Sequence, residues 1–219
     1  VVHGFGLEAG KPLASSSRIA KIAFTGETTT GRLIMQYASQ NLIPVTLELG
    51  GKSANIIFDD APIDQAVEGI INGIFFNQGH VCCAGSRLFV QESVAEKVIR
   101  KLKHRMQSLQ VGNPLDKNTD VGAINSKEQL KIINRYIDIG IKEGSEFFQT
   151  DCAIPTEGYY CRPTLFINVA QSSILAQEEI FGPVLTIQTF RTVDEVIQKA
   201  NNSPYGLAAG VWTDKGSKI

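Results

Sequence analysis

Apolar and polar positions along the chain alternate in two periods, which predict strands and helices in turn. Short apolar runs at residues 22–25, 45–49, 54–58, 87–91, 163–169, 184–190 and 207–212 are typical of strands. Apolar residues at helical spacing predict helices over 28–41, 63–75, 94–106, 126–141 and 193–201. Because strands and amphipathic helices alternate, the pattern favours an α/β fold on a parallel sheet.

Glycine and proline residues mark a domain boundary and a helix start in this pattern. The pair Gly50-Gly51 stands between two predicted strands and indicates a domain junction, with one part over residues 1–49 and another over 50–219. Pro62 stands where the helix over 63–75 begins, and Asp60 is a candidate for its N-cap. The basic run between Arg100 and Arg105 is interpreted as the solvated face of a helix.

Composition and charge narrow the class of protein. The 219 residues carry 21 Lys and Arg against 22 Asp and Glu, a net charge of −1, so we expect no nucleic-acid partner. No apolar stretch reaches the roughly 20 residues of a membrane span, and the first residues lack the basic start of a signal peptide. We therefore expect no membrane partner and a cytoplasmic location.

Metal and disulfide chemistry receive little support from the sequence. The four cysteines show no C-x-x-C spacing, and the three histidines are scattered. The adjacent thiols Cys82 and Cys83 cannot complete a tetrahedral site without distant ligands. We expect reduced thiols and no metal.

The segment from Phe75 to Arg87 carries the sharpest chemical signal. It places Cys82 and Cys83 among small residues after a long helix, where a substrate can approach a sulfur and where His80 or Arg87 would favour its thiolate. Taken alone, this segment is explained more simply by buried, inert cysteines, since free cysteine is among the most buried residue types.

Three further segments each allow two interpretations. Glu48 inside an apolar run is either a desolvated general base or a charge paired with Lys52 or placed on an edge strand. The glycines Gly26 and Gly31 frame either a phosphate-binding turn or an ordinary one, and the Arg and Leu that follow disfavour an NTPase. Residues 178–183 place acids and an aromatic ring before a strand, suited to a ribose and a flat heterocycle or to a simple Gly-Pro turn.

Together and in this order, these segments resemble the NAD(P)-dependent aldehyde dehydrogenase superfamily. The resemblance runs through residues 24–26, 47–52, 75–87, 178–184 and 202–213, and so covers essentially the whole chain. It implies a doubly wound, Rossmann-like α/β fold with a mostly parallel sheet. It also implies that residues 1–49 end a coenzyme-binding domain and that residues 50–219 form most of a catalytic domain.

The resemblance assigns roles to named residues. Cys82 would be the nucleophile and Glu48 the general base, while Phe76 and Cys83 would line the substrate tunnel. The expected contacts to NAD or NADP are Gly26, Glu27, Thr30, Leu49, Glu179 and Phe181. The substrate would be a small-molecule aldehyde, and the complete protein would be a homodimer or homotetramer.

The chain departs from the family at two positions. His80 stands where Gln or Glu is usual, and Glu27 stands where Ser is common beside the pyrophosphate. A negative charge there repels phosphate unless it points away, and Glu27 would then stabilise its own helix N-terminus.

Three alternatives stay open at this point. The chain is expected to be part of a protein roughly twice as long. An inactive fragment and a non-catalytic protein of the same fold are therefore the first two alternatives. A cofactor-independent thiol hydrolase that pairs Cys82 with His80 is the third alternative. We expect that the 219 residues alone do not turn over aldehydes, because the adenosine half of the cofactor site would lie upstream.

Overall fold

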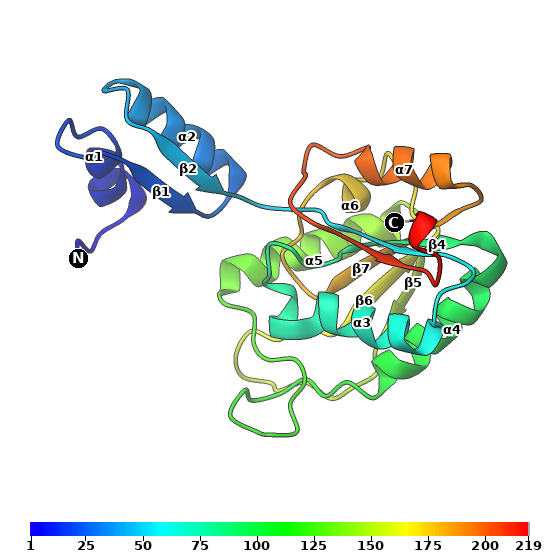
Figure 1. Ribbon diagram of the computed structural model, residues 1–219. Coiled ribbons are helices and arrows are strands. Elements are labelled where there is room, and N and C mark those ends of the chain that lie inside the picture. Colours follow the sequence, from blue (N-terminus) through cyan, green and yellow to red (C-terminus); the bar gives the residue numbers. More distant parts are fainter. Residues whose placement is uncertain (219) are drawn as a thin grey trace. The chain divides into compact units, whose positions relative to one another are not determined.

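A computed structural model of the chain describes residues 1–218 and divides it into two compact units, the first over Val1–Gly50 and the second starting at Gly51 (Figure 1). The first unit contains η1 (Gly6–Gly10), α1 (Lys11–Ala14), β1 (Ile22–Thr25), α2 (Thr28–Ser39) and β2 (Val45–Glu48). Strands β1 and β2 pair in parallel, and Thr25 lies opposite Glu48. The carboxyl ends of the two strands therefore bring Gly26 and Glu48 to one edge of this small sheet.

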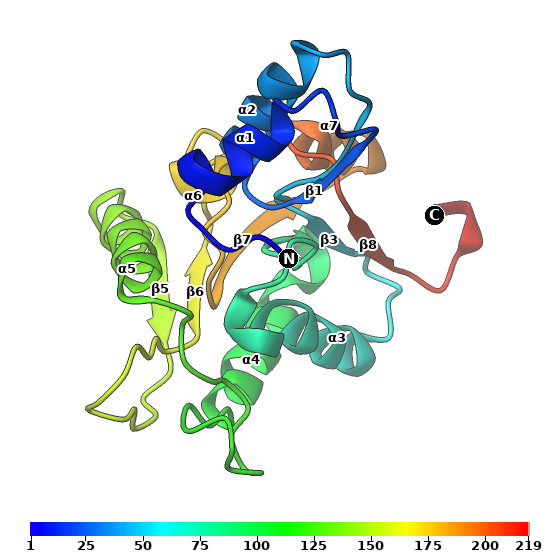
Figure 2. The same cartoon turned by 90° about the vertical axis from the view of Figure 1, so that its left-hand side faces the viewer.

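The second unit is built on a six-stranded sheet in the order β5-β6-β7-β4-β3-β8. Its strands are β3 (Ala54–Ile57), β4 (Arg87–Gln91), β5 (Glu146–Gln149), β6 (Thr164–Ile167), β7 (Val184–Phe190) and β8 (Ala209–Trp212). All neighbours pair in parallel except β5, which runs antiparallel to β6 at one edge, as Figure 2 shows. Strand β8 forms the opposite edge and was expected from its apolar pattern, whereas β5 was not.

Helices cover both faces of this sheet. They are α3 (Ile63–Phe75), α4 (Glu92–Gln107), α5 (Lys127–Lys142), α6 (Ile174–Gln177) and α7 (Val193–Asn201), with short η2 (Phe76–Gly79) and η3 (Gly216–Lys218). Leu88 and Val90 of β4 pack in one cluster with α3 and α4, while Phe89 between them packs in another with Val196 of α7. Because successive strand residues face opposite sides, β4 is buried on both faces, which confirms a doubly wound sheet.

The ends of the helices agree with the sequence signals except at one point. Ser126 Oγ accepts the N–H of Gln129 and caps α5. The proposed cap of α3 by Asp60 is wrong, because Pro62 occupies the N-cap position without a side-chain bond. Asp60 instead accepts a hydrogen bond of 2.8 Å from the hydroxyl of Thr213 and so holds the segment after β8.

Basic residues on α4 form ion pairs at the surface of the second unit. Lys101 contacts Asp64, Lys103 contacts Glu146, and the guanidinium of Arg105 contacts Glu68. These side chains are partly exposed, which agrees with the interpretation of the basic run as a solvated helix face.

Candidate active site

The segment that carries the two adjacent thiols is held in a constrained turn after α3. Asn77 and Gln78 adopt φ of 49° and 47°, and Gly79 follows at 76°. A Cβ on Gly79 would lie 2.2 Å from the carbonyl oxygen of Gly182, so this position requires glycine for both its conformation and its space. The turn is thereby locked against the loop before β7.

Cys82 and Cys83 are both exposed in the loop that follows this turn. The interpretation of buried, inert cysteines is therefore wrong for this pair, although it describes Cys161. Burial raises the pKa of the Cys161 thiol to about 12, so that sulfur stays protonated at neutral pH. The two thiols that sequence reasoning singled out are those that a small molecule can reach.

Gly51 joins the thiol loop to the acidic segment before β7. Its N–H donates to Oε1 of Glu179 at 3.1 Å, and a Cβ on Gly51 would lie 2.5 Å from the carbonyl oxygen of Cys82. The neighbouring Glu178 turns away and accepts a 2.5 Å hydrogen bond from the hydroxyl of Tyr136 on α5. Glu179, not Glu178, therefore contacts the glycine that lies against the backbone of Cys82.

Phe76 and Cys83 line one cavity of about 320 Å³. The cavity also contacts Asn55 and Asn72 and is bounded by small residues at the start of β8. The structure thus brings together the two residues expected to line a substrate tunnel, and it adds two amide side chains from β3 and α3. Sequence patterns alone did not indicate these amides, because they are polar positions within otherwise buried elements.

His80 contacts Phe181 and the loop before α5, and neither nitrogen is directed to a thiol. The two rings stack with centroids 5.1 Å apart and planes 12° from parallel, and Nε2 accepts the N–H of Asn125 at 3.2 Å. Burial lowers the pKa of His80, which favours the neutral ring. Because Nε2 is already an acceptor, His80 is unsuited to take a proton from Cys82.

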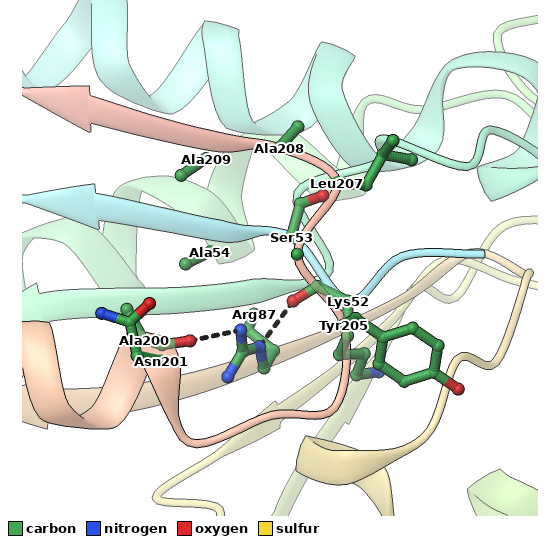
Figure 3. A pocket seen from close by; sticks show the side chains of 11 residues that line it. Lys52, Ser53, Ala54, Arg87, Ala200, Asn201, Tyr205, Leu207, Ala208 and Ala209 are labelled. Carbon is green, nitrogen blue, oxygen red and sulfur yellow. Dashed lines mark hydrogen bonds between the residues drawn. The ribbon is translucent and has the colours of Figure 1, made fainter. Parts of the chain in front are cut away.

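The guanidinium of Arg87 forms hydrogen bonds with backbone carbonyl groups. It is buried and donates to the carbonyl oxygens of Lys52, Lys199 and Ala200, which fixes the C-terminal end of α7 (Figure 3). The expectation that Arg87 favours the thiolate of Cys82 is therefore not supported by its contacts.

Lys52 is a buried cation that sequence reasoning considered only as a partner of Glu48. It lines a cavity of about 310 Å³ beside Tyr205 (Figure 3). Its side chain is 1% exposed, and Nζ has no hydrogen-bond partner among residues 1–218. Burial, with a smaller contribution from Arg87, lowers the pKa of Lys52 to about 7, although Glu179 acts in the opposite direction.

In the first unit, five expected site residues gather at the carboxyl ends of β1 and β2. The N–H of Gly26 donates to the carbonyl of Glu48 at 3.0 Å, and the side chain of Glu48 is exposed. The side chain of Leu49 lies against Gly31, where a Cβ would be 2.5 Å from it. Glu27 and Thr30 begin α2 at the same edge.

Glu27 caps α2, as the sequence suggested for a carboxylate in this place. Its two oxygens accept the N–H groups of Thr29 at 2.7 Å and Thr30 at 2.9 Å. Partial burial is the largest single cause and raises the pKa of Glu27. The hydrogen bonds from Thr29 and Thr30 together outweigh it, so the pKa of Glu27 lies below its ordinary value. An anion bound at this helix start must compete with a carboxylate already there.

Two classes of site find no support in the described chain. Within residues 1–218, no three His, Cys, Asp or Glu side chains form a group that could hold a metal ion. Over the same residues, no helix has the length and apolar character to cross a membrane.

Comparisons with known proteins bear on the family of the chain. The sequence profile of the Aldehyde dehydrogenase family matches residues 1–219. Acetaldehyde dehydrogenase 2 of Cupriavidus necator is 51% identical and matches 100% of this chain but 45% of its own length. An NAD+ complex of an aldehyde dehydrogenase from Bacillus cereus superimposes with a TM-score of 0.94 at 42% identity, over 98% of this chain and 44% of that one.

A betaine aldehyde dehydrogenase from Staphylococcus aureus, solved with NAD+, gives a TM-score of 0.94 at 37% identity over 99% of this chain and 44% of its own. The chain therefore spans about 45% of the length of the relatives it matches. With a family profile over its full length and half of its residues shared with a curated relative, the chain belongs to the aldehyde dehydrogenase family.

Proposed function

We propose that this chain supplies the nucleophile and base of an enzyme that oxidises an aldehyde to a carboxylic acid, with NAD or NADP as hydride acceptor. The observation that carries the proposal is the position of Gly51, which touches the backbone of exposed Cys82 on one side and the carboxylate of Glu179 on the other. A nucleophile and a carboxylate suited to ribose hydroxyls thus belong to one site.

The nicotinamide end of a dinucleotide fits the residues of the second unit. The carboxylate of Glu179 is oriented by a backbone N–H and is half-buried, as a ligand to sugar hydroxyls needs to be. Phe181, whose backbone φ is 53°, offers a flat, half-exposed ring that stacks against the ring of His80. Glu179 and Phe181 would hold the nicotinamide, which would supply the acceptor for the hydride that leaves the former carbonyl carbon when the Cys82 adduct is oxidised to a thioester.

The pyrophosphate end fits less well at the first turn of α2. The N–H groups of Thr29 and Thr30, which would suit a phosphate, are taken by Glu27. Gly26 and Leu49 lie beside Glu48 at the carboxyl ends of β1 and β2, and we therefore assign these two residues to the cofactor-binding site. We expect Glu27 to act as a helix cap.

The chain's own groups have distinct tasks in this chemistry. The thiol of Cys82 gives up its proton to solvent, its sulfur forms a C–S bond to the carbonyl carbon, and the carbonyl electron pair moves to oxygen. After the thioester has formed, Glu48 accepts a proton from water, whose oxygen attacks the acyl carbon. The C–S bond then breaks, its electrons return to sulfur, and the carboxylic acid leaves. Phe76 and Cys83 would hold the organic part of the aldehyde in the cavity beside the nucleophile.

The test is an assay of the complete protein that carries these residues, with an aldehyde and either NAD+ or NADP+. We expect Cys82→Ala to lose at least about a thousandfold in rate. Glu48→Gln should lose about a hundredfold or more and accumulate an acyl group on Cys82, visible by mass spectrometry. Cys152→Ala, which removes a thiol outside the site, is the control and should keep its activity. Aldehyde oxidation at the normal rate by Cys82→Ala would remove the proposal.

A thiol hydrolase is the weaker candidate, because His80 already uses Nε2 as an acceptor from Asn125. Ester hydrolysis without cofactor by the 219-residue chain distinguishes the two. We expect an ester to acylate Cys82, and we expect His80→Gln to leave that acylation rate unchanged. A loss of about a hundredfold in His80→Gln would favour the hydrolase.

A further inference from the structure

The stack of His80 on Phe181 connects three segments that are distant in sequence. His80 follows the left-handed turn at residues 77–79, and its carbonyl accepts Nδ2–H of Asn77 at 3.1 Å. On the far side, Nε2 accepts the N–H of Asn125, immediately before the cap of α5. The imidazole therefore stands between the thiol segment, the start of α5 and the ring of Phe181.

This hydrogen bond fixes the state of the imidazole. An Nε2 that accepts carries no proton, so the neutral ring carries its proton on Nδ1, which is buried near the backbone of Phe181. If the ring becomes protonated, Nε2 gains a hydrogen that points at the N–H of Asn125. The two backbone-directed donors then oppose each other, so this contact is lost, and the ring must shift for its new N–H to use the side chain of Asn125, which favours the protonated form.

Phe181 depends on its neighbours for its conformation. Its φ of 53° lies in the left-handed region, which is uncommon for an aromatic residue. Gln129 of α5 fixes the backbone by donating Nε2–H to the carbonyls of Ile180 and Phe181 at 3.0 and 3.1 Å. The ring itself has one described aromatic partner, which is His80.

We propose that neutral His80 is a positioning residue that holds the ring of Phe181 in place for the nicotinamide, and that protonation of His80 releases this ring. The inference rests on the proposed function, because it assigns Phe181 to the cofactor.

Charged groups of the neighbouring elements do not replace this effect. Glu178 and Glu179 flank Phe181 but are bonded to Tyr136 and Gly51, and Lys127 and Glu128 begin α5. None of them is among the causes that shift the pKa of His80: burial lowers this pKa most, and the backbone of Phe181 and the side chain of Asn125 raise it by a smaller amount. The titration of this ring therefore reports on the stack and on its contact with Asn125.

The first experiment measures initial rates of the complete protein at varied NAD+ between about pH 4.5 and about pH 8, because burial places the pKa of His80 below that of an ordinary histidine. We expect the KM for NAD+ to rise about three- to tenfold toward acid pH, with a smaller change in kcat. His80→Gln, whose amide oxygen can accept from Asn125 but does not titrate, should flatten this dependence. His80→Phe keeps a ring for the stack and should flatten it too. An unchanged pH dependence in both variants would overturn the proposal.

The second experiment does not require catalysis. The ring signals of Phe181 in the 219-residue chain, assigned by comparison with Phe181→Leu, are followed by NMR through the same pH range. We expect them to shift with the titration of His80 and to stay constant in His80→Gln. If they do not move in the wild-type chain, the positioning role is wrong. If they move but no aldehyde is oxidised by the complete protein, the stack is established and the proposed function has failed.

Discussion

Replacement of Lys52 by methionine should remove a steep dependence of stability on pH. Lys52 is 1% exposed, and within the described part of the chain its amino group has no hydrogen-bond partner. Its pKa falls from 10.5 to about 7 because burial disfavours the charged form. Methionine is unbranched, has a similar length and carries no charge, so Lys52→Met keeps most of the packing and removes the desolvation cost.

The sign of the effect follows from proton binding in the two states. Below about pH 7 the native and unfolded chains both carry the proton on Lys52, and the native state bears the full cost of about 5 kcal/mol. Between about pH 7 and 10.5 only the unfolded chain stays protonated, so native stability rises with pH. From about pH 7 to about 8.5 the gain is about 1.5 kcal/mol. Cys161 has the opposite effect, but only above about pH 9, near the ordinary pKa of a thiol.

Urea unfolding followed by tryptophan fluorescence measures this gain in stability for the second structural unit, which contains Lys52. Trp212 is the single tryptophan of the chain, and its indole donates to Asn55 Oδ1 at 2.9 Å within the second unit. We expect the wild-type midpoint to rise by about 0.5 to 1.5 M urea across that pH range. Lys52→Met should be more stable at the lower pH, with this rise absent.

Lys117→Met is the matched control, since Lys117 lies in an exposed turn. It should keep the wild-type dependence on pH. If the wild-type midpoint does not change, or if Lys52→Met retains the same slope, then the amino group is not desolvated as its burial indicates, and the reasoning is refuted.

Three other predictions test features of the site and its scaffold. Gly79→Ala should destabilise the second unit by about 3 kcal/mol or more in urea, because Gly79 has φ of 76° and a Cβ there would lie 2.2 Å from the carbonyl oxygen of Gly182. Gly73→Ala on α3 is the control: its Cβ meets no atom within 4 Å, so it should be neutral or stabilising. Glu27→Ala should cost about 1 kcal/mol through loss of the cap of α2, and Glu27→Ser should recover most of it; equal stability of the three proteins in thermal unfolding would contradict this role. In timed alkylation at neutral pH, mass spectrometry should find Cys82 modified well before buried Cys161, and simultaneous labelling would mean that the second unit opens readily.

Most of the fold could be predicted because its elements are periodic. The run at residues 87–91 and the apolar stripe at residues 63–75 are long enough to specify a strand and a helix by themselves, and both were confirmed. Strand β5 was missed because Glu146–Gln149 has four residues with polar ends, and only its pairing with β6 makes it a strand. Asp60 was misassigned because its partner, Thr213, lies 153 residues away.

Sequence reasoning could identify site residues where a reactive residue type stands at a characteristic spacing in a motif. It could not identify properties of the site that depend on burial in the folded chain. The exposure of Cys82 reverses the more conservative interpretation of its segment, which composition alone had favoured. The charge state of Lys52 and the contact between His80 and Asn125 depend on segments that meet only in the folded chain. No local pattern encodes how much water a fold removes from one amino group.

The pairing of β8 with β3 also governs the order in which the second unit can fold. Trp212 bonds to Asn55 across 157 residues, and its indole fills the space over Gly69 on α3, where a Cβ would be 2.3 Å away. During synthesis, β3 and α3 leave the ribosome long before Trp212 does, so one edge of β3 stays unpaired until the chain through residue 212 has emerged. Contacts of such long range slow folding and leave an apolar edge open to other chains. Expression at low temperature or with chaperones should therefore improve the soluble yield of this protein.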